Sequence, residues 1–208
     1  MSQDVAGIIL AGGQSRRMGG GDKTLLSFGD GSLLSRIVSR LAPQVGPLAL
    51  SANGDPARFA GFGLPVLADT VEGFAGPLAG ILTGLEWASM ACDAVVTVAG
   101  DTPFLPKNLV ERLVAAADER PGSIAVACSG GKRHPTFALW PAELHDALRR
   151  FLVDEGNRRV SAFIDRHGFV EAEFPMLKSG GREIDPFFNI NTPDDLAVAG
   201  RLLQSVEP

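Results

Sequence analysis

The clearest strand of the sequence is Ala94-Val95-Val96-Thr97-Val98-Ala99, an almost unbroken apolar run. A strand of this kind is typical of a parallel sheet that helices cover on both faces. Short apolar runs alternate with helical periodicity around it: the sequence predicts strands over residues 5–10, 48–50 and 65–68 and helices over residues 33–41, 78–90 and 106–117. This alternation predicts an α/β fold, a Rossmann-like, mostly parallel, doubly wound sheet with helices on both faces.

The residues after position 122 follow a different pattern. Apolar runs over residues 123–128 and 135–140 flank the polar stretch Ser129–His134, which predicts a hairpin or a crossover. Beyond it we expect helices over residues 142–152 and 160–166, a strand over 169–174, an exposed loop over 178–182 and a last helix over 193–204. Because no repeat or linker interrupts the chain, residues 1–208 are predicted to form one domain whose second half supplies the other wall of a cleft.

The composition narrows the class of protein. Of the 208 residues 45% are hydrophobic and the net charge is −5, so the basic surface of a general nucleic-acid-binding protein is not expected. The two cysteines, Cys92 and Cys128, cannot build a disulfide framework or a thiolate zinc site. No apolar run reaches the ~18 residues of a membrane span, and the N-terminus lacks the basic start of a secretory signal. We expect a cytoplasmic protein with neither nucleic acid nor membrane as a partner.

A glycine-rich loop with three cations follows the first predicted strand. It runs Ala11-Gly12-Gly13-Gln14-Ser15-Arg16-Arg17-Met18-Gly19-Gly20-Gly21-Asp22-Lys23. Glycines let backbone N–H groups approach an anion closely, and Arg and Lys side chains neutralise it. In a doubly wound sheet such a loop lies at the carboxyl edge of the strands, where ligands bind. The loop therefore predicts a polyanionic ligand.

Two common nucleotide-binding motifs do not fit this loop. The segment Gly21-Asp22-Lys23-Thr24 resembles the end of a P-loop, but Asp22 separates the glycine from the lysine. Gly19 and Gly21 match the start of a dinucleotide fingerprint, but Thr24 stands where the third glycine would be. Both motifs are therefore disfavoured.

The loop resembles the signature of cofactor and sugar nucleotidyltransferases, Leu-Ala-Gly-Gly-x-Ser-x-Arg-Met-Gly followed by Asp-Lys, which here spans Leu10 to Lys23. Over about Val5 to Leu203 the chain looks most like the molybdenum cofactor guanylyltransferases, through three further segments: Gly76–Gly80, Gly100–Pro103 and Asn189–Pro193. The similar cytidylyltransferases replace glycines in the first loop and in Gly76–Gly80. The resemblance implies a fold of the nucleotidyltransferase type, with about residues 5–120 binding GTP and about residues 121–208 binding the acceptor.

The same resemblance implies transfer of GMP from GTP to the terminal phosphate of molybdopterin, with release of pyrophosphate. Because two anions must meet, catalysis would consist chiefly of charge neutralisation and alignment. Arg17, Lys23 and Asp101 are the expected catalytic residues. The two cations would hold the β- and γ-phosphates, and Asp101, which follows the strand of residues 94–99, would bind Mg²⁺. Asp101 could instead cap the turn before Thr102-Pro103.

Further residues are assigned to the two substrates by resemblance. Those expected to bind GTP are Leu10, Ala11, Gly12, Gly13, Lys23, Ser51, Asn53, Asp69, Gly76, Gly80 and Asp101. Ser51 replaces an asparagine of the family, so Asn53 would take over its contact or start a turn, and Asp69 would face the base or ribose or lie in a turn.

Arg159, Asn189 and Asn191 are the expected acceptor-binding residues. The two asparagines alternate along an extended segment, so their side chains would face the same side. His134 would orient the acceptor or lie exposed at a hairpin tip.

Other functions stay open at this point. The same chemistry could use CTP with molybdopterin or a sugar 1-phosphate as acceptor, or the chain could be a non-catalytic protein that delivers the cofactor to an oxidoreductase. The intact Arg17, Lys23 and Asp101 favour catalysis. The resemblance also implies transient contacts with molybdenum-insertion and molybdoenzyme-delivery proteins.

Overall fold

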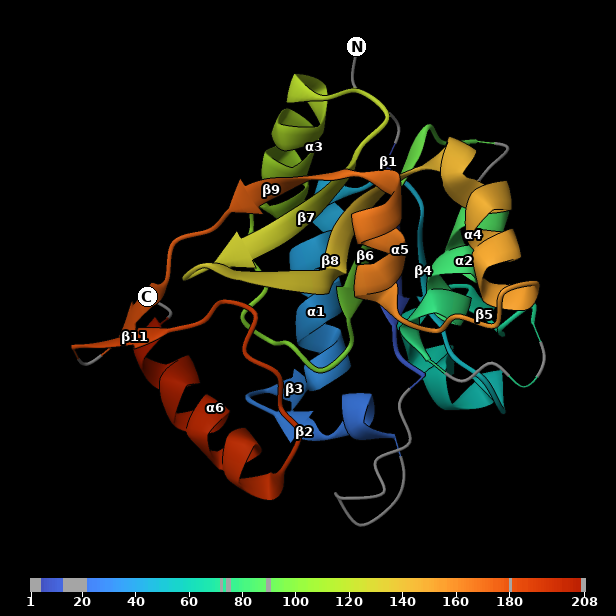
Figure 1. The fold of residues 1–208 in the computed structure, drawn as a ribbon. Helices are drawn as coiled ribbons and strands as arrows, with labels where there is room; N and C mark the ends of the chain where they lie inside the picture. Colours follow the sequence, from blue (N-terminus) through green and yellow to red (C-terminus); the bar gives the residue numbers. More distant parts are fainter. Residues whose placement is uncertain are drawn as a thin grey trace.

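The computed structural model describes residues 5–12, 22–71, 73, 76–88, 91–179 and 181–206. Its centre is a seven-stranded sheet in the order β5-β4-β1-β6-β8-β7-β9 (Figure 1). The strands are β1 (Val5–Leu10), β4 (Leu48–Ser51), β5 (Val66–Leu67), β6 (Ala94–Ala99), β7 (Ile124–Ser129), β8 (Lys132–Pro141) and β9 (Phe169–Glu173). β8 runs antiparallel to β6 and β7, and the other neighbouring pairs are parallel. The predicted mostly parallel sheet is confirmed.

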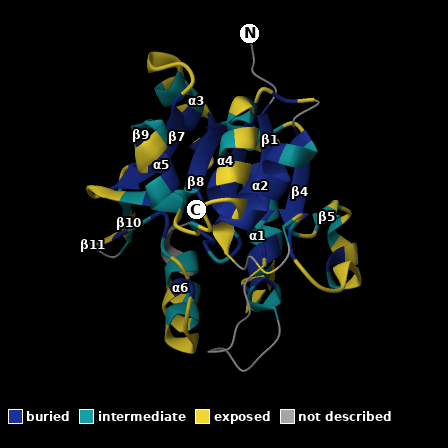
Figure 2. Ribbon diagram, turned by 45° about the vertical axis from the view of Figure 1, so that its right-hand side comes forward, coloured by how far each residue is buried: buried dark blue, intermediate teal, exposed yellow. Residues whose placement is uncertain are grey.

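Helices cover both faces of this sheet. Successive residues of a strand point to opposite faces, and in the central strands the residues on both faces are mostly apolar. In β1, Ile9 packs in the layer of α1 (Leu33–Leu41) and α3 (Leu109–Glu119). Its neighbour Ile8 packs in the layer of α2 (Pro77–Ala88), α4 (His145–Val153) and α5 (Val160–His167). Buried residues accordingly fill the central strands, and the outer sides of the helices are exposed (Figure 2). The doubly wound α/β prediction is confirmed as well.

The C-terminal helix α6 (Pro193–Val206) lies outside these two layers, near the short strands β2 (Ser27–Phe28) and β3 (Gly31–Ser32) (Figure 1). Its Ala199 belongs to a third apolar cluster with Phe28, Phe104 and Ile190. Phe104 follows β6 and Ile190 precedes α6. The cluster therefore holds the C-terminal segment against the loop that follows β6.

The structure selects one of two predicted alternatives in one segment and overturns the prediction in another. The polar stretch after β7 forms a hairpin turn rather than a crossover, with Gly130 at φ 54° and Gly131 at φ 74°, the left-handed backbone that two-residue hairpin loops need. The exposed loop predicted over residues 178–182 is wrong: β10 (Leu177–Ser179) pairs antiparallel with β11 (Arg182–Ile184). Strands of three residues carry too little alternation to be recognised from sequence.

Two helices begin later than their sequence predicts. The helix predicted from residue 142 begins as the turn η4 (Ala142–Leu144), and the one predicted from residue 106 begins at Leu109. Further 3₁₀ turns are η1 (Lys23–Leu25), η2 (Ala42–Gln44) and η3 (Pro56–Phe62). None of the helices in the described parts of the chain is long and apolar enough to cross a membrane.

Candidate active site at the carboxyl edge of the sheet

Three parallel strands end at the same level of the sheet. Leu10 of β1 is in register with Ser51 of β4 on one side and Ala99 of β6 on the other. The backbone continues this register beyond the strands, since Ala11 N donates to Ser51 O (2.9 Å) and Gly100 N donates to Leu10 O (3.0 Å). The loops that follow the three strands therefore start side by side, at the edge where doubly wound sheets bind their ligands.

Lys23 connects two of these loops with the C-terminal segment. Its Nζ donates to Asp101 Oδ2 at 2.7 Å and to Asn191 Oδ1 at 2.8 Å. The two charged side chains are largely shielded, with 12% of Lys23 and 22% of Asp101 exposed. Three residues predicted for the site are thus in direct contact. Asp101 and Asn191, which follow Lys23 by 78 and 168 residues in the chain, both accept a hydrogen bond from its ammonium group.

Both asparagines of the C-terminal segment face this cluster. Thr102 Oγ1 donates to Asn189 Oδ1 at 2.8 Å, and Ile190 N donates to Asp101 O at 3.0 Å. The segment therefore runs along the Asp101-Thr102 backbone, with the side chains of Asn189 and Asn191 on the same side, as their alternate spacing predicts.

Helix α6 begins directly after this segment, with a reciprocal cap. Asn191 N and Thr192 N both donate to Asp195 Oδ2 at 2.9 Å, and Asp195 N donates to Thr192 Oγ1 at 3.1 Å. These hydrogen bonds, the one from the Asn191 backbone first, lower the pKa of Asp195. The cap fixes where the segment ends and so the position of Asn191.

Helix α1 and the turn η2 after it hold the loop that carries Asp101 through side-chain hydrogen bonds. Two arginines of α1 and Gln44 of η2, spaced four residues apart, donate to three carbonyls of the loop: Arg36 Nε to Pro103 (3.1 Å), Arg40 Nη1 to Leu105 (2.9 Å) and Gln44 Nε2 to Pro106 (3.0 Å). Sequence reasoning missed these residues, because a polar stripe opposite an apolar face looks like a solvated surface.

A second pair of predicted residues lies at the ends of β4 and β5. Asn53 Nδ2 donates to Asp69 Oδ2, and Asp69 N donates to Asn53 Oδ1, both at 2.8 Å. Burial raises the pKa of Asp69, and the hydrogen bond from Asn53 opposes that shift. Asn53 also accepts a hydrogen bond from Arg58 Nη2 on its carbonyl, and Arg58 forms an ion pair with Asp22, the residue before Lys23. The Asn53–Asp69 pair is thereby tied to the first loop.

Gly80 brings helix α2 into direct contact with this edge. A Cβ at Gly80 would lie 2.5 Å from Ser51 Oγ and 2.8 Å from Leu10 Cδ2, so any side chain there would force Ser51 or Leu10 to shift. Ser51 itself is buried, and its small side chain is what allows this approach. Gly12 differs, because a Cβ there would find its nearest atoms 3.7 Å away, at Ala52 Cα and Ser51 O. Gly76 precedes α2 with φ 142°.

Some predicted residues are not brought into contact with the cluster. Gly13 and Arg17 lie outside the described residues. Arg159 is exposed at the residue before α5, and within the described parts of the chain no side-chain hydrogen bond joins it to Lys23, Asp101 or Asn191. Its neighbour Arg158 donates to Gly73 O at 3.4 Å, which ties the start of α5 to the loop before α2.

The oxygen atoms around Asp101 suit a hard cation. Asn191 Oδ1 accepts from Lys23, which also donates to Asp101, and Asn189 Oδ1 accepts from Thr102, the residue after Asp101. The Thr24 side chain lies against Gly100, and its buried Oγ1 has no hydrogen-bond partner among the described residues. Among the described residues no three His, Cys, Asp or Glu side chains form a closed metal site. A single carboxylate with neutral oxygens fits Mg²⁺, which keeps several waters and is shared with phosphates, and does not fit zinc.

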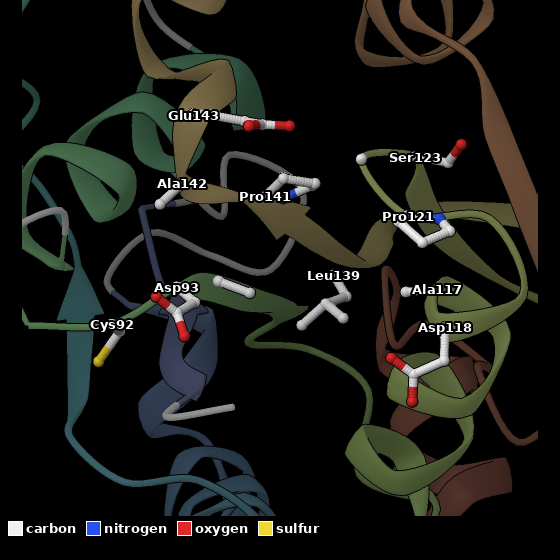
Figure 3. A pocket seen from close by; sticks show the side chains of 12 residues that line it. Cys92, Asp93, Ala117, Asp118, Pro121, Ser123, Leu139, Pro141, Ala142 and Glu143 are labelled. Carbon is white, nitrogen blue, oxygen red and sulfur yellow. The ribbon is translucent and has the colours of Figure 1, made fainter. Parts of the chain in front are cut away.

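A cavity of about 460 Å³ lies at the opposite edge of the sheet (Figure 3). It is lined by the residues just before β6 and β7 and just after β8, among them Asp93, Ser123 and Glu143. Asp93 and Asp101 flank the same strand at its two ends. The cavity is therefore separate from the Lys23–Asp101 cluster and shares no lining residue with it.

His134 is placed differently from the exposed hairpin-tip position that its sequence suggested. It is 7% exposed, and its Nε2 lies 2.8 Å from Ser129 Oγ, which donates to Asp185 Oδ1 at 2.8 Å. The pKa of His134 is lowered by burial, with Asp185 opposing this and Lys132 adding to it. Sequence reasoning missed Ser129 and Asp185, because nothing in their spacing shows that β7 and the C-terminal segment meet.

Comparison with known proteins agrees with the motifs and the geometry. The MobA-like NTP transferase domain matches residues 7–169. The chain is 72% identical over 208 residues to the molybdenum cofactor guanylyltransferase of Mesorhizobium japonicum, which covers 99% of each chain.

Two solved structures have a similar fold at low sequence identity. The molybdopterin-guanine dinucleotide biosynthesis protein A of Archaeoglobus fulgidus superposes with a TM-score of 0.74 at 22% identity, covering 96% of this chain and 98% of that one. Rv0371C of Mycobacterium tuberculosis, solved in complex with manganese, has a TM-score of 0.68 at 20% identity, covering 96% and 99%. These two likenesses support the α/β nucleotidyltransferase fold, and the family follows from the sequence matches. The chain belongs to the MobA-like NTP transferase family, and within it to the molybdenum cofactor guanylyltransferases.

Proposed function

We propose that this protein transfers GMP from GTP to the terminal phosphate of molybdopterin, giving molybdopterin guanine dinucleotide and pyrophosphate. The observation that carries the proposal is the meeting of Lys23, Asp101 and Asn191 at the carboxyl edge of the sheet. The 72% identity with a molybdenum cofactor guanylyltransferase supports the choice of both substrates.

The reaction is a displacement at the α-phosphorus of GTP. An oxygen of the acceptor phosphate forms a bond to that phosphorus, and the bond to the bridging oxygen of the β-phosphate breaks, so that both electrons leave with pyrophosphate. The attacking oxygen is already anionic and needs no general base. Catalysis then depends on positive charge placed where the negative charge moves, which Lys23 and Arg17 would supply.

Asp101 would hold Mg²⁺ in this proposal, and the unpartnered hydroxyl of Thr24, whose side chain lies against Gly100, would be a further oxygen near it. The ion supplies further charge neutralisation on the phosphates. Lys23 lies within hydrogen-bond reach of the same carboxylate, so the ammonium is already directed to the place where the phosphates would meet the cation. The partial burial of this pair strengthens its electrostatic interaction relative to water.

The two substrates would approach from opposite sides of Lys23. Residues 5–120 would bind GTP, with the backbone of Leu10, Ala11, Gly12 and Gly13 at the nucleoside and the Asn53–Asp69 pair at the base or ribose. Ser51, Gly76 and Gly80 would shape the same wall, and the close contact of Gly80 with Ser51 supports Asn53 as the residue that offers a polar side chain there.

Residues 121–208 would bind molybdopterin through Arg159, Asn189 and Asn191, as one half of a single domain. The Lys23–Asn191 hydrogen bond supports this arrangement, because it joins the residue proposed for the acceptor to the one proposed for the phosphates. Transient contacts with molybdenum-insertion and molybdoenzyme-delivery proteins belong to this proposal through the family resemblance alone.

The decisive experiment offers the protein each of the four nucleoside triphosphates with Mg²⁺ and molybdopterin, and measures pyrophosphate release and the dinucleotide product. We expect turnover with GTP and little with CTP, ATP or UTP. Turnover with CTP but not GTP would refute the base assignment. Nucleotide binding without turnover would favour the delivery function instead.

A further inference from the structure

Ser129, His134 and Asp185 form a largely buried hydrogen-bonded chain outside the Lys23–Asp101 cluster. Ser129 ends β7, His134 lies in β8, and Asp185 follows β11. Ser129 Oγ lies 2.8 Å from both His134 Nε2 and Asp185 Oδ1, and His134 Nε2 lies 3.6 Å from Asp185 Oδ2. Ser129 is 2% and His134 7% exposed, so the contact between them is buried, whereas the Asp185 side chain is 25% exposed.

The direction of the hydrogen bonds in this chain follows from the groups themselves. The Asp185 carboxylate can only accept, so the single hydroxyl proton of Ser129 goes to Asp185. The Ser129 oxygen then accepts from His134, which must carry its proton on Nε2. A Ser–His–Asp set usually suggests a nucleophile whose hydroxyl donates a hydrogen bond to the imidazole. Here the Ser129 hydroxyl donates its hydrogen bond to the Asp185 carboxylate instead. The arrangement is that of a structural tether.

Asp185 passes this tether on to the segment that carries the two asparagines. Its Oδ1 also accepts from Phe187 N at 2.8 Å, and its carbonyl accepts from Phe188 N at 3.0 Å. The turn at Asp185 therefore fixes the direction in which the chain leaves toward Asn189, Ile190 and Asn191.

Aromatic packing reinforces the same turn. The His134 ring lies against Phe187, with ring centroids 4.5 Å apart and an interplanar angle of 33°. Phe187 also contacts Phe137 at 4.8 Å and Phe174 at 5.3 Å. His134 is thus linked to the segment of residues 185–191 in two ways. One is the hydrogen-bonded chain through Ser129 to Asp185, and the other is its ring contact with Phe187.

Two fixed points then bracket the asparagines. Upstream is the His134–Ser129–Asp185 chain, and downstream is the Asp195 cap of α6. Between them, Ile190 N donates to Asp101 O. A shift at the upstream point would move Asn189 and Asn191 relative to Asp101 and Lys23, because only a few residues separate them.

We propose that His134 is a positioning residue for the acceptor site: through Ser129 and Asp185 it sets the place of Asn189 and Asn191 beside Lys23 and Asp101. This inference rests on the proposed function in one respect, the assignment of the asparagines to the molybdopterin side. His134 itself touches neither the asparagines nor Lys23 through any described hydrogen bond, and it acts through the chain segment.

The first test measures backbone hydrogen exchange in the free protein and needs no activity. His134→Phe keeps a ring against Phe187 but has no Nε2–H, whereas His134→Gln places an amide N–H near the position of Nε2. We expect amides of residues 187–191 to exchange at least about tenfold faster in His134→Phe, with β1 and β6 unchanged and His134→Gln close to wild type. Unchanged exchange over residues 187–191 in His134→Phe would overturn the proposal.

The second test separates the two substrates in steady-state kinetics. We expect His134→Phe to raise the KM for molybdopterin about tenfold, to leave the KM for GTP within about twofold, and to be rescued by His134→Gln. An equal rise in both KM values, or no rescue by glutamine, would show general destabilisation and contradict the positioning role. If His134→Phe does not fold, Ser129→Ala removes the same link with a smaller change and is judged by the same criteria.

The two tests distinguish the failure of this inference from the failure of the proposed function. Wild-type protein that transfers no GMP to molybdopterin would refute the proposed function, and the exchange experiment would still decide whether His134 places the segment. Wild-type transfer with unaltered molybdopterin KM in a folded His134→Phe variant would refute the positioning role alone.

Discussion

The Lys23 ammonium lies 2.7 Å from the Asp101 carboxylate, although 78 residues separate them in the chain. The contact joins the glycine-rich loop after β1 to the loop after β6, and Asn191 closes it from the C-terminal side at 2.8 Å. An ammonium, a carboxylate and an amide from three distant segments thus meet at one largely shielded site. This relationship leads to the first two predictions.

Replacing Lys23 by alanine should lower the rate of pyrophosphate release by about 10²–10³-fold, because a preorganised donor to the moving charge is lost. The fold should survive, since the side chain lies at the carboxyl edge of the sheet and Lys23 is not among the buried core residues. Circular dichroism and pyrophosphate release measure the two effects. Lys107→Ala, at an exposed lysine before α3, is the matched control and should keep wild-type activity. Wild-type turnover by Lys23→Ala would rule out its assigned role.

Asp101 and Asp93 offer a matched pair at the two ends of β6. Asp101→Asn keeps the shape of the side chain but removes its charge, so we expect Mg²⁺-dependent activity to fall at least about 100-fold. Asp93→Asn changes the opposite edge, beside the cavity there, and should leave activity within about twofold. The rates are measured across a Mg²⁺ titration and in EDTA. Full activity of the wild type in EDTA, or equal losses in both variants, would contradict a metal-binding role for Asp101.

Several parts of this site follow from sequence for a simple geometric reason. In a parallel sheet the residues just after the strands meet at one edge, so the loop after Leu10, Asn53 and Asp101 could be placed together without coordinates. Asn189 and Asn191 share a side because an extended chain alternates. The cap of α6 follows from Thr192-Pro193 with its acidic first turn.

The remaining features depend on contacts between segments whose relative position no periodicity reveals. The Lys23–Asn191 hydrogen bond spans 168 residues, and Asp185 meets Ser129 only because β11 leads back past the end of β7. From sequence, the serine at position 51 indicated only that a contact made by the family asparagine is missing or is taken over by Asn53. In the fold its small side chain admits Gly80, whose Cβ position lies 2.5 Å from Ser51 Oγ.

Two glycines of the predicted GTP site should respond differently to alanine. At Gly80 the new methyl group would overlap Ser51 Oγ and Leu10 Cδ2, so we expect the free energy of unfolding to fall by about 1–3 kcal/mol despite the better helix propensity of alanine. At Gly12 the methyl group finds ordinary contact distances of 3.7 Å, so stability should hold. GTP affinity should still fall in Gly12→Ala if the nucleotide approaches this backbone closely.

Denaturant unfolding and a GTP-binding titration separate these two effects. A Gly80→Ala variant as stable as wild type would show that Ser51 and Leu10 can give way, and would remove the packing explanation for serine at position 51. A Gly12→Ala variant with unaltered GTP affinity would move the nucleotide away from this part of the first loop.

The pH dependence of stability should report on His134 directly. Burial lowers its pKa in the folded state below the value of about 6.5 for an unfolded chain, while Asp185 opposes the shift and Lys132 adds to it. As the pH falls below about 6.5, His134 binds a proton in the unfolded chain. In the folded chain it stays neutral until the pH reaches its lower folded pKa. The contribution of neutral His134 to the free energy of unfolding is therefore fully present above about pH 6.5. It decreases as the pH falls from there through the folded pKa.

The burial of His167 lowers its pKa too, with Arg166 and Arg150 adding to the shift, so the wild type should lose stability on acidification through both imidazoles. Glutamine at position 134 cannot be protonated, so the free energy of unfolding of His134→Gln should fall less between pH 7 and pH 5 than that of wild type. His134→Gln/His167→Gln should fall least. Urea unfolding at a series of pH values measures these differences. An equal or steeper loss in His134→Gln would mean that His134 is protonated in the fold at no cost, and that burial does not set its charge.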